Sequence, residues 1–471
     1  MSPRRTLLLA PILACSCGGG AAELGRPNVI LVSIDSLRSD HMGCYGYGRR
    51  TTPNIDLLAR EGVVFEEHVS STSWTLPAHA GLFTSVPDSV HGCVDATETA
   101  LAPEFETLAE RFLDGGYRTA GFYAGPYLHE AFGLGQGFEV YEYVVEGETF
   151  RSDSRDEWAN DPQAHRQSHQ GVTNEMLYSA ARSWLEEHAD EPFFCFLHFW
   201  DVHYDFTPPA PWDTAFDPGY AGPIDGTDFF TDATIAPGMD PADLAHLVAL
   251  YDGEIGWTDT FIGRLREDLE TWGVHERTLI AITSDHGTEF FEHGGKGHRR
   301  TLFDEVLRVP LVLWYPAELQ ASRVRHQTRS IDVGPTLLEL VDLAPPAAAS
   351  GQSLLAIVRG AEPAFDNTAV AELRTVGFDL RAVRTRDDKL IHDANQPADP
   401  ARWFDLRSDP RERRPRLLDD GRGPEVRARF LEAVAELGRA VEGRPGGPVE
   451  VQLPSDIQSD LQEIGYVGDD E

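Results

Sequence analysis

The sequence predicts an α/β fold: a large, mainly parallel mixed sheet sandwiched by helices, followed by a smaller C-terminal α+β subdomain. Three observations predict it. Continuous apolar runs recur over the first 359 residues, helical segments separate them, and the pattern changes to short strands after about residue 360. Strands that are apolar on both faces are typical of a parallel sheet covered by helices. Alternation of strands with helices produces that topology.

The first elements follow from local signals. Residues 28–34, NVILVSI, form a continuous apolar strand. Pro53 occupies the first turn of a helix that Thr52 caps and that ends at Glu61, before Gly62. Apolar spacing and glycine stops then predict a helix over 104–114, a strand over 118–123, a helix over 173–188 and a strand over 193–200.

The second half continues this alternation after one long loop. Residues 204–241, rich in Pro, Asp and Gly, indicate that loop. Beyond it we expect a helix over 242–272, strands over 279–283 and 309–314, a helix over 331–341, short strands around 380–391 and a helix over 424–440. The predicted division is a signal and tether over 1–27, a large α/β domain over 28–359 and the subdomain over 360–471.

The composition excludes several classes of function. The chain has 471 residues, with 40 Lys and Arg against 77 Asp and Glu, so its formal net charge is −37. With 41% hydrophobic and 25% charged residues, it has the composition of a folded globular protein. So acidic a chain argues against non-specific nucleic-acid binding and against a polybasic hold on anionic lipid.

The N-terminus predicts export. Arg4 and Arg5 precede an apolar run over 7–14 that is too short to span a bilayer, which needs about 20 residues. Cys15 follows a small residue at the end of this run, as in a bacterial lipobox, and glycines 18–20 form a tether. We expect a bacterial cell-envelope protein, a periplasmic lipoprotein that meets the membrane only through an N-terminal lipid anchor. Plain secretion is the alternative.

Three cysteines lie in the body of the chain, a set too sparse for a disulfide framework. Cys195 lies in an apolar run and is expected in the core. Whether Cys44 and Cys93 pair in an oxidising periplasm stays open at this point.

Acidic and imidazole groups follow three of the buried strands. In open α/β sheets, ligands bind beyond the carboxyl ends of the strands. Asp35 follows the first strand, and the pairs Asp285 with His286 and Asp201 with His203 follow two others. A single Asp after a strand is usually a turn or cap residue. Three such sites together predict a divalent cation, because Asp and His are its ligands.

Two further segments belong to this prediction. In SWTLPAHAGL, residues 73–82, Thr75 lies in the first turn of a helix, whose amide groups attract an anion. Thr75 is either the N-cap or a nucleophile held on a metal, and the local residues favour the N-cap. In EFFEHGGKGH, residues 289–298, glycines bend the backbone so that Lys296 and His298 face an anion; a surface loop is the alternative.

The chain resembles the sulfatase family of the alkaline phosphatase superfamily. The matching stretches run in the family's order from residue 27 to near the end, and they are "PNVILVSIDSLRSDHMGCYGY", "TPNIDLLAREGVVFEEHVS", "TLPAHAGLFTS", "FLHFWDVH", "YDGEIGWTD", "TSDHGTEFFEHGG", "LRVPLVLWYP", "IDVGPTLLELVDL", "FDLRSDP" and "LQEIGYV". The resemblance implies that Asp35, Asp285 and His286 are metal ligands and that Thr75 holds the nucleophile position. It implies that three residues bind the transferred anion or protonate the leaving oxygen: His203, Lys296 and His298.

The chain departs from the family pattern at several positions. Sulfatases carry a Cys or Ser that is oxidised to formylglycine, but Thr75 cannot become that aldehyde because its β-carbon bears a methyl group. His79 replaces the Arg that steadies the modified residue. Ser36 follows Asp35 where the family has a second Asp, so one carboxylate is missing. Residues 124–126, AGP, replace the Gly-Lys-Trp-His segment that contacts sulfate in many sulfatases.

The Thr-x-Pro-x-His pattern is similar to the nucleotide pyrophosphatase/phosphodiesterase branch, in which an unmodified Thr attacks phosphorus. Relatives of that kind hold two metals, and Asp201, His203 and His298 could supply a second site here. For the first site, a mixed oxygen and imidazole set suits Zn²⁺ or Mn²⁺, whereas the family default is Ca²⁺ or Mg²⁺.

The expected function is metal-dependent hydrolysis of a sulfate or phosphate ester, with Thr75 as the metal-activated nucleophile. One alternative is a phosphodiesterase or phosphoglycerol-type transferase that acts on envelope lipids or glycans. Another is a binding protein that kept the fold and lost the chemistry. The substrate is a small molecule, glycan or lipid ester; the loop over 204–241 and the C-terminal subdomain shape its pocket, with Tyr204, Trp212 and Phe229 as rings for stacking.

Overall fold

The structure, a computed structural model, describes residues 25–95, 99–145, 148–150, 173–363, 367–375, 377–395 and 401–450. The predicted signal and lipobox, with Cys15 and Cys17, lie outside these residues, as does the terminal LQEIGYV segment. Within the described part, no helix combines the length and hydrophobicity that crossing a bilayer would require.

The core of the molecule is one ten-stranded sheet, ordered β11-β2-β12-β8-β1-β7-β4-β5-β6, with β13 paired to β2. The central strand β1 (Asn28–Ile34) pairs in parallel with β8 (Thr278–Thr283) and with β7 (Phe193–Phe199). The other strands are β4 (Arg118–Tyr123), β5 (Val140–Val145), β6 (Glu148–Phe150), β2 (Val63–Val69), β11 (Arg308–Val309), β12 (Leu311–Trp314) and β13 (Ser322–Arg329).

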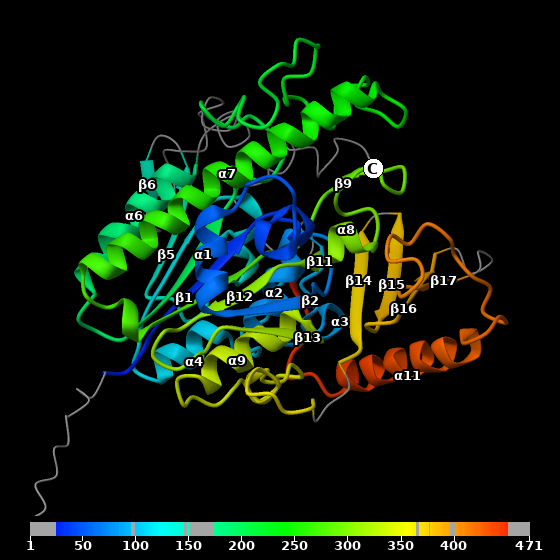
Figure 1. The fold of residues 1–471 in the computed structure, drawn as a ribbon. Coiled ribbons are helices and arrows are strands. Elements are labelled where there is room, and N and C mark those ends of the chain that lie inside the picture. Colours follow the sequence, from blue (N-terminus) through cyan, green and yellow to red (C-terminus); the bar gives the residue numbers. More distant parts are fainter. Residues whose placement is uncertain are drawn as a thin grey trace, which may run out of the picture.

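Helices cover both faces of this sheet because every residue of β1 is buried and successive side chains point to opposite sides. Val29 and Leu31 pack with α2 (Thr75–Thr84), α4 (Leu108–Asp114) and α9 (Val333–Glu339), whereas Ile30 and Val32 pack with α1 (Pro53–Glu61), α6 (Asn174–Glu187) and α7 (Pro241–Thr271). Figure 1 shows α6 and α7 on one side of the sheet and α4 and α9 on the other. The predicted α/β fold with a mainly parallel sheet is confirmed.

The short elements complete the architecture. They are the helices α3 (Asp88–His91), α8 (Asp304–Leu307) and α10 (Leu355–Val358), the 3₁₀ turns η1 (Ser39–His41), η2 (Gly43–Tyr45), η3 (Pro126–Leu128), η4 (Glu130–Phe132), η5 (His275–Arg277) and η6 (Ser330–Asp332), and the strands β3 (Thr99–Ala100), β9 (Glu289–Phe290), β10 (Lys296–Gly297) and β18 (Val449–Glu450). Residues 204–240 form the predicted loop, without a helix or strand.

Some boundaries differ from the prediction. The helix expected over 104–114 begins at Leu108, because Thr107 and Glu110 form a capping box that starts it there. The strand expected over 309–314 is divided at Pro310, which has no N–H for the ladder. Helix 331–341 opens as the 3₁₀ turn η6 and ends at Glu339. Strands β2 and β13 were not predicted, because polar residues interrupt their apolar runs.

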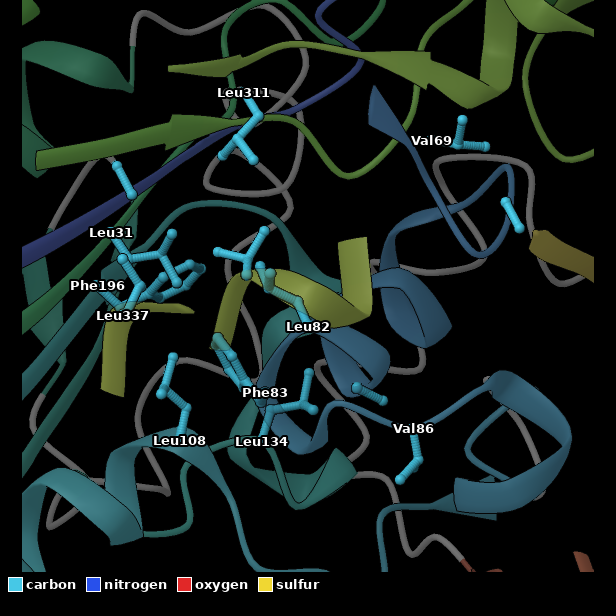
Figure 2. Packing of buried hydrophobic residues seen from close by; sticks show 14 of the residues in the cluster. Leu31, Val69, Leu82, Phe83, Val86, Leu108, Leu134, Phe196, Leu311 and Leu337 are labelled. Carbon is cyan, nitrogen blue, oxygen red and sulfur yellow. The ribbon is translucent and has the colours of Figure 1, made fainter. Parts of the chain in front are cut away.

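Helix α2 is buried along its whole length, because all ten of its residues are buried. Its C-terminal half anchors it: Figure 2 shows Leu82 and Phe83 directed toward Phe196 and Leu31 of the sheet. The rings of Phe83 and Phe196 meet edge to face with centroids 4.9 Å apart. This packing holds the first turn of α2, and with it Thr75, against the sheet edge.

The C-terminal segment forms an antiparallel sheet, β14-β15-β16-β17, backed by helix α11 (Gly423–Glu442). Its strands are β14 (Ala369–Thr375), β15 (Phe378–Arg384), β16 (Asp388–Asp393) and β17 (Arg402–Asp405). Figure 1 shows this sheet and α11 beside the large sheet rather than as part of it. Leu390, Trp403 and Val426 form a small apolar core between β16, β17 and α11.

A network of buried charges joins this smaller sheet to the large domain. Lys389 of β16, which is fully buried, lies 2.9 Å from both Asp304 Oδ1 and Glu412 Oε1. Arg384 of β15 lies 2.7 Å from Asp304 Oδ2 and 2.9 Å from Glu67 Oε2. Burial opposes ionisation of Asp304, but the charges of Arg384 and Lys389 outweigh it and hold the pKa of that carboxyl far below its usual range.

We expect Asp304→Asn to lower the free energy of unfolding by about 3 kcal/mol at pH 7, because it leaves two buried cations without their shared anion. The pKa of Asp304 is depressed in the folded state, so its contribution is present above pH ~4 and is lost as the pH falls below that value. The difference in the free energy of unfolding between wild type and Asp304→Asn, measured by guanidinium titration, should therefore stay constant from pH 7 to 5 and become smaller below pH 4.

The exposed Asp213→Asn serves as the control and should change the free energy of unfolding by less than about 0.5 kcal/mol. A gap that is equally wide at pH 3 and pH 7 would show that the ion pairs are not its source.

Candidate active site and metal centre

The parallel strands at the centre of the sheet deliver the predicted residues to one edge. Ser33 of β1 is the register partner of Thr283 in β8 and of His198 in β7. Asp35 therefore leaves the sheet beside Asp285, and Ser36 N–H donates to Asp285 Oδ1 at 3.2 Å. Ser36 takes a left-handed backbone conformation (φ 56°), which turns the chain at this point.

Three predicted metal ligands and Thr75 converge. The hydroxyl of Thr75 donates to Asp35 Oδ2 at 3.3 Å and lies 3.3 Å from His286 Nε2, which in turn lies 3.4 Å from Asp285 Oδ2. His286 Nδ1–H donates to the Gly287 carbonyl at 2.9 Å, so the lone pair of Nε2 points into the cluster. All four side chains are buried.

The cluster fits a divalent cation. Asp285 Oδ2 is buried and has no hydrogen-bond partner among the described residues, although leaving a carboxylate oxygen so is costly. Burial also raises the pKa of Asp35 above its ordinary value, and His286 and a hydrogen bond from Ser36 only partly oppose this. A cation held by Asp35, Asp285 and His286 would supply the missing positive charge.

Thr75 is not the N-cap that the local sequence favours. The N-cap is Trp74, whose extended backbone (φ −160°) precedes the first helical residue, Thr75. The helix starts one residue earlier than a capping Thr would require. The Thr75 hydroxyl is consequently free of any capping role and is directed at Asp35 and His286.

His79 holds the first turn of α2 in place. Its Nδ1–H donates to the Thr75 carbonyl at 2.8 Å, and its Nε2 accepts from the Ser33 hydroxyl at 3.0 Å. Burial lowers the pKa of His79 to about 3, with the neighbouring His198 adding to the effect. A neutral imidazole with both nitrogens engaged positions Thr75 relative to β1.

His203 and His298 lie next to the cluster. The ring of His298 is centred 4.2 Å from that of His286 and 5.0 Å from that of His203. His203 is stacked on Trp200 at 4.0 Å, and its Nδ1–H donates to the Tyr204 carbonyl at 2.8 Å. Burial, followed by the charges of His286 and His203, lowers the pKa of His298 well below its usual value, so its resting form is neutral.

Lys296 is directed elsewhere. Its ammonium donates to the Ile235 carbonyl at 2.7 Å and lies 5.5 Å from the ring centre of Phe229, in the long loop. Arg299, which the sequence motifs did not single out, instead contacts Trp74, the residue before Thr75. Its guanidinium lies 4.3 Å from the ring centre of Trp74. The sequence signal that could have identified Arg299 is its position directly after His298.

The structure corrects the second metal site. Asp201 accepts hydrogen bonds from Thr173 N–H at 2.9 Å, Asn174 N–H at 3.2 Å and Trp257 Nε1–H at 2.9 Å. Its carboxylate thus caps the start of helix α6. Among the described residues, the groups whose ligand atoms converge do not combine Asp201 with His203 and His298.

His198 is a second residue at this site that sequence reasoning missed. Its ring lies in β7, its Nδ1–H donates to the Ala124 carbonyl at 2.8 Å, and its Nε2 lies 3.4 Å from Asp35 Oδ2. The strand was predicted, but the residues FFCFLHF were interpreted only as an apolar run, so the histidine near the carboxyl end of the strand was not considered as a site residue.

The expectation that Tyr204, Trp212 and Phe229 offer rings for stacking is corrected, and the question left open about Cys44 and Cys93 is answered. Tyr204 and Phe229 are buried and pack against each other, with ring centroids 5.8 Å apart, so they fill the base of the loop rather than offer a free stacking surface. The ring of Trp212 covers Gly256 of α7, where an added Cβ would lie 2.4 Å from it. Cys44 and Cys93 are both free thiols, so they do not pair.

Two family models match this chain. A family model described as Sulfatase matches residues 27–343, and one described as N-sulphoglucosamine sulphohydrolase, C-terminal, matches residues 292–439. The chain is 27% identical over 442 residues to the uncharacterized sulfatase YidJ of Escherichia coli (strain K12), covering 87% of each chain. It is 26% identical to the multifunctional alkaline phosphatase superfamily protein PehA of Trinickia caryophylli, covering 82% of this chain and 90% of that one.

Solved structures show the same fold. The phosphonate monoester hydrolase of Agrobacterium radiobacter matches with a TM-score of 0.69 and 23% identity, over 91% of this chain and 100% of that one. The structure of BT4656 in complex with its substrate D-glucosamine-2-N,6-O-disulfate matches with a TM-score of 0.67 and 19% identity, over 94% and 99% of the two chains.

We expect divalent cations to stabilise the protein through this cluster. Protein treated with EDTA should gain about 2.7 kcal/mol in the free energy of unfolding when Zn²⁺ or Mn²⁺ is added at 100 times its Kd. Asp285→Asn should abolish the gain, because it removes the anionic oxygen that has no other partner among the described residues. Calorimetric melting of the two proteins, with and without the ion, measures the difference.

Glu289→Gln is the matched control, since Glu289 also lies in a group of acids with a histidine, His293. There both imidazole nitrogens are engaged, by Glu305 Oε1 and by the Glu412 carbonyl. The control should keep the full gain; equal losses in both variants would mean that the ion binds elsewhere.

Proposed function

Because the chain belongs to the sulfatase family of the alkaline phosphatase superfamily and is a sulfate or phosphate ester hydrolase, we propose that its nucleophile is the unmodified hydroxyl of Thr75. The observation that supports this proposal is the position of Thr75 Oγ1, 3.3 Å from both Asp35 Oδ2 and His286 Nε2. A divalent cation held by Asp35, Asp285 and His286 would, when bound, lower the pKa of the hydroxyl and offset the charge of the transferred group.

The residues of the chain carry the first step. Thr75 Oγ attacks sulfur or phosphorus in line, the bond to the leaving alcohol oxygen breaks, and the hydroxyl proton passes to Asp35 Oδ2, which accepts its hydrogen bond. Asp35 is placed to accept this proton because its Oδ2 already accepts the hydrogen bond of the Thr75 hydroxyl. Water then attacks the sulfur or phosphorus of the Thr75 ester, and the bond to Thr75 Oγ breaks. Asp35 returns its proton to Thr75 Oγ, and the imidazole that protonated the leaving alcohol takes a proton from the attacking water.

Positioning comes from His79 and from the packing of α2. Because His79 ties the Thr75 carbonyl to Ser33, the hydroxyl stays aligned with the carboxyl ends of β1 and β8. A misplacement of about 1 Å can cost a hundredfold in rate, which is why such a rigid mounting matters. In this chain the neutral imidazole takes the position that the family gives to a steadying Arg.

The leaving oxygen receives its proton on the other side of the site. His298 and His203 lie beyond His286, and we assign the proton donor to this pair. Burial and the neighbouring histidines lower the pKa of His298. An anionic sulfate or phosphate group beside this ring would act in the opposite direction and favour its protonated form.

From the N-terminal sequence we also propose that the protein is exported and acts in the bacterial cell envelope, tethered by a lipid on Cys15. Its substrate is then an ester of a small molecule, glycan or lipid that is accessible in that compartment.

We expect Thr75→Ala to lower kcat/KM at least about a thousandfold, because it removes the attacking oxygen. Thr75→Ser should keep measurable turnover, since it retains the hydroxyl. Rapid quenching followed by mass spectrometry should detect a sulfo or phospho ester on the peptide that contains Thr75. Thr84→Ala, at the other end of α2, is the control and should keep near-normal kcat/KM while losing only its bond to Ala80. Full turnover by Thr75→Ala refutes the assignment.

Substrate class is tested by comparing kcat/KM for an aryl sulfate, a phosphate monoester and a phosphodiester with one common leaving group. We expect measurable hydrolysis of at least one, abolished by EDTA and restored by Zn²⁺ or Mn²⁺. Preference for the diester would favour the phosphodiesterase alternative, and similar rates would indicate a promiscuous enzyme. Substrate binding without turnover of any ester would instead support the alternative of a binding protein.

A further inference from the structure

We propose that His198 is a direct ligand of the catalytic cation and replaces the carboxylate that the family carries where this chain has Ser36. The inference rests on the metal centre of the proposed function and extends it: an imidazole in place of a carboxylate would shift the site toward Zn²⁺ or Mn²⁺ and away from Ca²⁺ or Mg²⁺.

The tautomer of His198 supports the proposal. The side chain is fully buried in β7, and Nδ1–H donates to the Ala124 carbonyl at 2.8 Å. Nε2 therefore carries the lone pair, and it has no hydrogen-bond partner among the described residues. This nitrogen lies 3.4 Å from Asp35 Oδ2. A ring nitrogen of His198 also lies within 4.8 Å of ligand atoms of Asp285 and His79. A cation bound next to Nε2 would satisfy its lone pair and the carboxylate of Asp35 together.

A buried unpartnered imidazole is not enough by itself, as His68 shows. His68, in β2, is also fully buried, its Nδ1 bonds to Thr328 Oγ1 at 2.9 Å, and its Nε2 has no partner in the described part of the chain. Among the described residues, however, His68 belongs to none of the groups whose ligand atoms converge. The two histidines differ in what they face, and of the two it is His198 that faces carboxylates.

Successive donor atoms along the cluster are spaced like neighbouring ligands of one small ion. Neighbouring donors along the cluster, from His198 through Asp35, Thr75 and His286 to Asp285, are separated by 3.4, 3.3, 3.3 and 3.4 Å. Ligands bound to one Zn²⁺ at about 2.0–2.2 Å lie roughly 3–3.5 Å apart. His79 also has a ring nitrogen within 4.8 Å of ligand atoms of His198 and Asp285, but hydrogen bonds engage both of its nitrogens.

The exchange of ligand chemistry carries a consequence for metal choice. Ca²⁺ and Mg²⁺ take oxygen ligands, whereas imidazole suits Zn²⁺ and other transition ions. Two histidines and two aspartates would make this site richer in nitrogen than a set of two aspartates and one histidine. His198 thus restores the number of metal ligands that is lower by one carboxylate at Ser36, but an imidazole is a softer ligand than the carboxylate it replaces.

The test measures metal binding rather than turnover. Isothermal titration of metal-free protein with Zn²⁺ and with Ca²⁺ compares wild type, His198→Ala and the matched control His68→Ala, which removes an equally buried imidazole. We expect His198→Ala to weaken Zn²⁺ binding at least about tenfold and His68→Ala to change it less than about threefold. X-ray absorption of the Zn²⁺-loaded wild type should count two imidazoles, and one in His198→Ala.

A double variant guards against misfolding as the explanation. Ser36→Asp restores the carboxylate, and Asp tolerates the left-handed backbone at this position. In the His198→Ala background it should recover binding and favour Ca²⁺ over Zn²⁺ relative to wild type. Unchanged Zn²⁺ affinity in His198→Ala, or a single imidazole in wild type, would overturn the proposal. Loss of turnover in Thr75→Ala with intact metal binding tests the nucleophile separately, so the two failures are distinguishable.

Discussion

The structure depends on the meeting of two buried carboxylates, Asp35 and Asp285, at the end of adjacent parallel strands. Parallel pairing of β1 with β8 fixes their separation, and the surrounding core removes the water that would otherwise solvate them. Such a pair is unfavourable without a positive partner. Everything else at the site serves this arrangement: Ser36 bridges the two acids, His286 turns its lone pair toward them, and α2 brings in a hydroxyl.

The fold and the first set of ligands could be predicted because their signals are local. Apolar runs identify β1, β7 and β8, and the polar residues that follow them must share an edge once the strands are parallel. His198 could not be found this way. It lies inside a strand, and only the register of β7 against β1 shows that its ring reaches Asp35. The prediction for Lys296 was wrong because it relied on residue type alone. An ammonium group suits an anion, but here it donates a hydrogen bond to the Ile235 carbonyl in the long loop.

The departures from the family pattern are related to one another in space. Thr75 keeps an unmodified hydroxyl, His79 steadies its backbone, and His198 stands close to the place where Ser36 has no carboxylate. Asp201 illustrates the limit of motif spacing, because an Asp two residues before a His suggests a metal pair. Its carboxylate instead accepts three hydrogen bonds from the start of α6 and one from Trp257 of α7. Contacts in the folded structure, rather than spacing along the sequence, show which of these residues lie together.

The buried ions between the two sheets have a consequence for how this protein could be divided. Asp304 follows His298 by only a few residues, and its counter-ions, Arg384 and Lys389, come from the smaller sheet. A truncation between the sheets would leave an anion in the interior on one side and two cations on the other. The two parts are therefore expected to fold as a single unit. A break between them would also disturb the candidate active site, because Asp304 lies in the segment that follows His298.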